Sequence, residues 1–192
     1  MLRRRSLRVL LMNKIKEKSF KASFGGISAA LSLIIMAILG SFQSMTYAAP
    51  VICGFFIAFA VIEFSSKFAF ALYLAVSVLA LAVVPNKEAV VFYALFFGFY
   101  PILKGFIESR TKGAVSWIIK YVIFNIAIII AYLICSKLLN IPYDEVGFLG
   151  KFTLLFLWGS GNVAFLIYDI AFTRVVTLYI YKWQKYVKRL LK

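Results

Sequence analysis

Six apolar runs, separated by short polar or turn-forming breaks, constrain the fold of this chain more than any other feature. They cover residues 24–42, 48–64, 68–84, 89–107, 114–139 and 152–179. A helix needs about 20 mostly apolar residues to cross a bilayer, and backbone groups in lipid must be paired within helices or closed barrels. We therefore predict an all-α integral membrane protein, with six transmembrane helices in a single compact bundle.

The composition indicates a membrane protein, and the placement of its charges distinguishes membrane lipids from nucleic acid as partners. Hydrophobic residues make up 64% of the chain and the mean hydropathy is +0.94, whereas soluble domains are about 45–50% apolar. The net charge of +15 would also suit a nucleic-acid-binding protein. However, the basic residues lie mainly at the two ends and in the breaks, as in membrane topology signals and contacts with anionic lipids. We predict membrane lipids as partners and no nucleic acid.

The distribution of basic residues also predicts the orientation. Of the 22 Lys and Arg residues, 17 lie in the N-terminal segment, in or beside the breaks at 63–67 and 108–113, and in the C-terminal tail. By the positive-inside rule both termini are then cytoplasmic. We divide the chain into a basic cytoplasmic or interfacial segment (1–21), the transmembrane domain (22–181) and a basic cytoplasmic tail (182–192).

Several polar side chains fall inside the apolar runs. A carboxylate at the bilayer centre costs at least about 2.5 kcal/mol, so Asp169 should face other helices and have a partner. Lys120 and Arg174 are the expected partners, and together with Asn125 they form the predicted buried polar network. Such a network either holds the helices together or has a direct functional role. In the fourth run, Lys104 is predicted to extend its amine to the membrane surface.

Motifs for catalysis are missing from the sequence. There is no histidine, which excludes common zinc, haem and Ser-His sites. The run from Gly159 to Asp169 superficially matches signatures of intramembrane aspartyl proteases, but it offers one carboxylate where that chemistry needs two. Cys53 and Cys135 lie inside apolar runs and are interpreted as buried small hydrophobes. We predict no enzyme activity, no metal and no cofactor.

Small residues recur at the beginning of the first apolar run. Ala22, Gly26 and Ala30 follow one another in steps of four, and Gly25 and Ala29 form a second pair beside them. In lipid, such faces allow another helix to approach closely. The partner helix belongs either to another protein or to this chain itself.

In length, number of runs and orientation, the chain from residue 21 onward resembles the S components, the substrate-binding membrane subunits of energy-coupling factor (ECF) transporters. The Ala22-Gly26-Ala30 series is similar to the AxxxA docking motif of that family, with glycine in place of the central alanine. The run 161–169 also resembles S-component-like bacterial membrane proteins. The resemblance implies a bacterial plasma membrane location, capture of a vitamin-like solute from outside, and docking on an ECF coupling module, which comprises a transmembrane subunit and two ATPases.

The resemblance also implies where the solute binds. In the family the pocket opens outward under the first outer loop, and the residues at corresponding positions are Gln43, Tyr47, Asn86, Lys87, Glu88, Tyr93, Trp158 and Asn162. The solute itself is not assigned. Two other functions stay open: a structural or assembly subunit of a membrane complex, and a stand-alone carrier of small solutes.

Overall fold

All six predicted runs are helical in the computed structural model, which describes residues 2–42, 45–138 and 151–185. The helices are α1 (Leu2–Gly40), α2 (Ala48–Glu63), α3 (Ser66–Val83), α4 (Lys87–Phe92), α5 (Tyr100–Arg110), α6 (Ala114–Leu133) and α7 (Lys151–Leu178). Short π-helical segments follow α4 (Tyr93–Phe97), α6 (Ile134–Leu138) and α7 (Tyr179–Trp183). The described part of the chain contains no strand, so the predicted all-helical fold is confirmed.

Five helical segments of the described chain are long and apolar enough to cross a membrane: Lys18–Gly40, Ser66–Val83, Lys87–Arg110, Ala114–Lys137 and Trp158–Trp183. The one predicted span that is not among them, 48–64, corresponds to α2, which is apolar but only 16 residues long. Large apolar side chains such as Ile118, Val122 and Ile126 on α6 are exposed. An outward-facing apolar surface of this kind is consistent with a multi-pass membrane protein.

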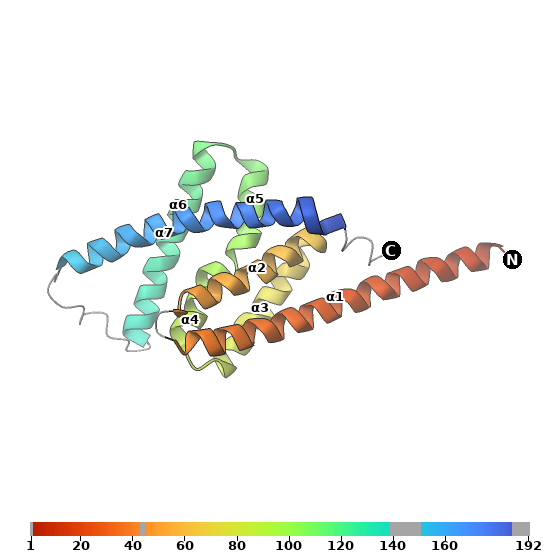
Figure 1. Cartoon of the computed structure of the whole chain (residues 1–192), viewed down its shortest axis with the longest axis horizontal. Helices are drawn as coiled ribbons and strands as arrows, with labels where there is room; N and C mark the ends of the chain where they lie inside the picture. Colours follow the sequence, from red (N-terminus) through yellow and green to blue (C-terminus); the bar gives the residue numbers. More distant parts are fainter. Residues whose placement is uncertain (1, 43–44, 139–150, 186–192) are drawn as a thin grey trace.

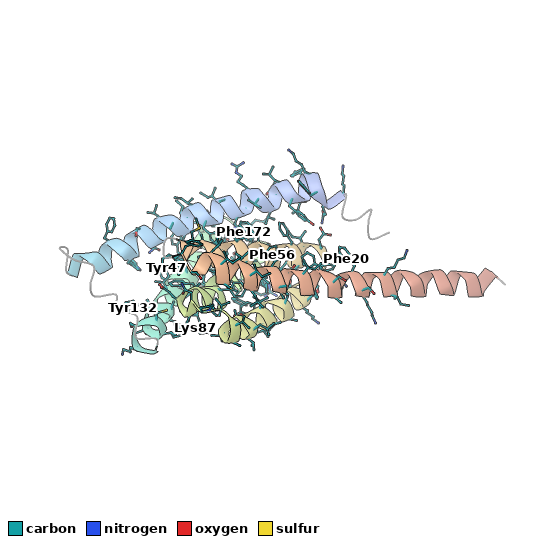
Figure 2. The ribbon with its side chains drawn as sticks, turned by 60° about the horizontal axis from the view of Figure 1, so that its bottom comes forward. Phe20, Tyr47, Phe56, Lys87, Tyr132 and Phe172 are labelled. Atoms are coloured by element: carbon teal, nitrogen blue, oxygen red, sulfur yellow. The ribbon has the colours of Figure 1, made fainter. Side chains whose placement is uncertain are left out.

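Helix α1 is longer than its predicted membrane span. The basic segment 2–21 and the first apolar run form one continuous helix of 39 residues, and its N-terminal part extends away from the other helices (Figure 1). Phe20 lies where α1 leaves the bundle, and Tyr47 and Lys87 lie toward the opposite end (Figure 2).

The fourth predicted span is interrupted. Between α4 and α5, the Gly98 amide donates to the Tyr93 carbonyl at 2.8 Å, five residues back. Pro101 in the next turn has no N–H to offer to the Phe97 carbonyl. A π-helical segment and a proline are both common causes of a helix kink, and here they lie at the end of one helical piece and in the first turn of the next.

Clusters of buried side chains hold the helices together, and the two largest are described here. The first lies between α1, α2, α3 and α4 and is rich in small residues, including Ala49, Cys53, Ala60, Ala69 and Ala80. These residues let the helices approach closely, and the Cys53 thiol lies 3.4 Å from the Ser32 carbonyl oxygen of α1.

The second cluster is aromatic and joins the kinked span to α6 and α7. Phe96 and Tyr100 pack against Phe124 of α6 and Phe165 of α7. The Phe124 and Phe165 rings are stacked with centroids 4.4 Å apart. This packing places the polar side chains of α5, α6 and α7 beside one another.

Candidate functional site

Four charged side chains from three helices meet beside the aromatic cluster, and we call Lys104, Glu108, Lys120 and Asp169 the charge cluster. On α5, Tyr100, Lys104 and Glu108 follow one another in steps of four and therefore share one helix face. Lys104 and Tyr100 both donate hydrogen bonds to Oδ1 of Asp169 on α7. Lys120 of α6 lies 3.1 Å from Oδ2 of the same carboxylate.

Glu108 is the partly exposed member of the charge cluster and pairs with both lysines. Its Oε1 atom lies 2.9 Å from the Lys104 amine and 2.5 Å from the Lys120 amine. Lys104, Lys120 and Asp169 are only 5%, 3% and 2% exposed, whereas the Glu108 side chain is 44% exposed. The two lysines balance the two carboxylates, and a buried ion pair is stable only when its charges are compensated and hydrogen-bonded in this way.

The structure corrects two sequence-based expectations here. Lys104 does not extend to the membrane surface, because it is buried and paired with Asp169. Arg174, expected in the buried network, is exposed. The sequence analysis did not include Lys104 and Glu108 among the partners in the buried network. The spacing of Tyr100, Lys104 and Glu108, which places them on a single helix face, could have indicated that they act together.

A second polar group, the amide cluster, joins α6 to α7 and consists of Asn125, Trp158 and Asn162. The two amides exchange hydrogen bonds of 3.0 and 3.2 Å. The indole N–H of Trp158 donates to Oδ1 of Asn125 at 2.7 Å. Asn125 thus belongs to this group, while Lys120, on the same helix, belongs to the charge cluster.

Asn86 joins the start of α4 to Gly40, the last residue of α1, and to Thr46, just before α2. Its Oδ1 atom accepts from the Ala89 amide at 3.1 Å, which caps α4. Its Nδ2 atom donates to the Gly40 carbonyl at 2.6 Å and to Oγ1 of Thr46 at 3.2 Å. One side chain therefore fixes both the helix start and the loop.

Tyr47 and Glu88 make a second link between the loop and α4. The Tyr47 hydroxyl donates to Glu88 at 2.7 Å. Partial burial of the phenol, and then the adjacent Glu88 carboxylate, raise the pKa of Tyr47 above its ordinary value, so the phenol remains the donor in this hydrogen bond.

Lys87 and Tyr93 lie nearby with different partners. The Lys87 amine donates to the carbonyls of Leu81 and Val84 at 2.7 and 2.9 Å, which closes the C-terminal end of α3. Tyr93 is completely buried, and its hydroxyl has no hydrogen-bond partner within the described ranges.

The predicted solute-binding residues thus fall in three places. Tyr47, Asn86, Lys87 and Glu88 gather at the start of α4. Tyr93 lies deeper, in the first core cluster with its ring against Gly98, and Trp158 and Asn162 lie in the amide cluster between α6 and α7. Gln43 lies outside the described residues.

The small residues of α1 divide into two faces. Ala22, Gly26 and Ala30 are exposed, and a Cβ atom built on Gly26 would meet nothing within 4 Å. Gly25 faces the interior, where a Cβ atom would lie 3.2 Å from the Phe68 ring, and Ala29 packs against the first core cluster. Among the described residues, the second pair packs within this chain and the first series is exposed.

We expect Asn86→Ala to lower the free energy of unfolding by about 1–2 kcal/mol, because it removes the α4 cap and leaves loop groups unpaired. Asn86→Asp keeps a cap acceptor but loses the donor to Gly40 and Thr46. The free energy of unfolding measured in detergent should therefore be highest for the wild type, lower for Asn86→Asp and lowest for Asn86→Ala. Equal stability of wild type and the alanine variant would contradict the proposed role of Asn86.

No group of three or more His, Cys, Asp or Glu side chains suited to a metal ion occurs in the described part of the chain. The polar side chains that meet in the described part of the chain are instead ion pairs, amides and phenols. No family model, curated protein or solved structure matches this chain.

Proposed function

We propose that this protein is the S component of an ECF-type importer, a six-span subunit of a bacterial plasma membrane with both termini in the cytoplasm. In this role it captures a small vitamin-like solute from outside and docks on a coupling module of a transmembrane subunit and two ATPases. It performs no catalysis itself.

The observation that carries the proposal is the exposed Ala22-Gly26-Ala30 face of α1. A small-residue face that packs against no other helix of the described chain is available for a helix of another protein. The neighbouring Gly25-Ala29 face already serves the internal packing. The exposed series therefore has no evident role in holding this chain together.

The polar groups at the loop and α4 support the solute-binding part of the proposal. Thr46 and Tyr47 are held to α4 by hydrogen bonds with Asn86 and Glu88, and such bonds can be exchanged for bonds to a ligand. The Tyr93 hydroxyl, deeper in the first core cluster, has no hydrogen-bond partner among the described residues and is a further group that a polar solute would satisfy. By the positive-inside rule this end faces outward.

The second candidate function is an assembly subunit without a solute site. It is favoured by the fact that the same polar side chains already have hydrogen-bond partners within the chain. Tyr47, Asn86 and Lys87 all have partners within the chain. This function needs the exposed α1 face but no ligand, so a solute measurement separates the two candidates.

The docking prediction is tested with Gly26→Leu, which fills the exposed face. We expect the variant to fold normally but to lose its copurification with the coupling module. Gly105→Leu on α5 is the matched control, because Gly105 is also an exposed helical glycine with nothing within 4 Å of a built Cβ atom. Equal recovery of the module with both variants would reject the docking face.

The solute prediction is tested by native mass spectrometry of the protein purified from its own membrane. A stoichiometric small molecule would support the S-component proposal and identify the solute. A protein without solute that copurifies with other membrane subunits would favour the assembly subunit.

A further inference from the structure

A cavity of about 430 Å³ lies between the α5–α6 turn and α7, at the opposite end of the fourth span from Asn86. Its lining includes Lys112, Gly113, Ser116, Lys120 and Arg174, and also the two carboxylates of the charge cluster, Glu108 and Asp169. Three features of this cavity point to an anion, and they are independent of the proposed solute site.

The first feature is the beginning of α6. Gly113 precedes this helix of 20 residues with a positive φ of 63°, and as a glycine it offers no side-chain cap to the first turn. The first amide groups of a helix lack partners within the helix and carry the positive end of its dipole. An anion in the cavity would lie beside them.

The second feature is the hydroxyl of Ser116, in that same first turn. Ser116 lines the cavity and is 6% exposed, yet its Oγ atom has no hydrogen-bond partner among the residues that the structure describes. A buried hydroxyl without a partner is costly, and an oxygen ligand in the cavity would accept its hydrogen bond.

The third feature is the charge around the cavity. Lys104 and Lys120 are balanced by Asp169 and Glu108 within the charge cluster. The remaining cationic side chains of the lining are Lys112 and Arg174, both exposed at its rim. The cavity therefore offers two positive charges beyond those that the carboxylates balance.

We propose that this cavity binds a phosphate group, held by the first turn of α6, the Ser116 hydroxyl and the side chains of Lys112 and Arg174. Phosphate suits this set, since it accepts several hydrogen bonds at once and pairs with both Arg and Lys. The phosphate comes either from a lipid headgroup or from a soluble phosphate compound. Basic pockets at the cytoplasmic ends of membrane helices bind lipid headgroups in this manner.

The site is tested by native mass spectrometry of the delipidated full-length protein. The probes are dioleoyl phosphatidate, dioleoylglycerol, which differs by lacking the phosphate, and inorganic phosphate. The main variant is Lys112→Gln/Arg174→Gln, and Ser116→Ala is the second. Lys67→Gln/Lys137→Gln is the matched control, because it removes two other exposed lysines.

We expect phosphatidate to bind and dioleoylglycerol not to bind. The main variant should bind phosphatidate at least about tenfold more weakly, because two charge-assisted contacts are lost. Ser116→Ala should weaken binding less, and the control should match wild type. Binding of phosphatidate alone identifies a lipid headgroup as the source, and competition by inorganic phosphate identifies a soluble one.

Equal affinity of the wild type for phosphatidate and dioleoylglycerol would overturn the proposal. So would an equal loss of phosphatidate affinity in the main variant and in the control variant. The unfolding midpoint of each variant in detergent shows whether the fold is intact. These outcomes are separate from those for the S component, since neither variant changes the α1 face or the loop.

Discussion

Replacing Asp169 by leucine is expected to lower the free energy of unfolding by about 3–5 kcal/mol, the cost of breaking a buried ion pair by removing one partner. The side chain is 2% exposed and pairs with Lys104 and Lys120, which are nearly as buried. Without the carboxylate, Glu108 alone would face two buried cations. If the Asp169 carboxylate contributed nothing to stability, Asp169→Leu would instead leave the free energy of unfolding unchanged or raise it.

Reversible unfolding in detergent measures the effect, and a second substitution tests its cause. Lys104→Met should partly restore the stability of Asp169→Leu, because Lys120 and Glu108 then remain as a balanced pair. Arg174→Gln is the control, since this exposed side chain lies outside the charge cluster. A coupling free energy below about 0.5 kcal/mol between residue 169 and each of Lys104 and Lys120 would reject the network.

The second large effect is expected at Gly54 of α2, where Gly54→Ala should lower the free energy of unfolding by about 1–3 kcal/mol through overpacking. An added Cβ atom would lie 2.6 Å from the Phe97 carbonyl oxygen of the π-helical segment. A backbone atom cannot move aside as a flexible side chain can. α2 must therefore shift away from the kinked span, which would disturb the packing between them.

Gly105→Ala is the matched control for this prediction. Gly105 also lies within a helix, but a Cβ atom there would meet nothing within 4 Å, so the change should be neutral or slightly stabilising through helix propensity. Thermal unfolding of both variants in the same detergent gives the comparison. Similar midpoints for the two would show that α2 does not depend on the close approach at Gly54.

The helices could be predicted from the sequence with small errors at their ends. Hydropathy and turn residues are local properties: Asn86 and Gly113 directly precede helices in the structure, and Pro50 lies in the first turn of α2. The continuity of α1 from Leu2 was not predicted, because a basic segment can end a membrane span while continuing the same helix.

The candidate sites could be predicted only in part. Asp169 was identified as a buried carboxylate from its position in an apolar run. Its contact with Lys104 depends on how α5 and α7 are packed by Phe96, Tyr100 and Phe165. The cavity beside α6 and the unpartnered Ser116 hydroxyl have no sequence signature at all.

By itself, the sequence determined that the chain forms apolar helices and that its charges lie mostly at their ends. Both properties follow from local composition and the 3.6-residue period. The tertiary structure alone decided which charges meet. Arg174 lies five residues from Asp169, which turns it by about 140° around α7, whereas Lys104 and Lys120 approach the carboxylate from neighbouring helices. Such contacts depend on the rotation and crossing of whole helices.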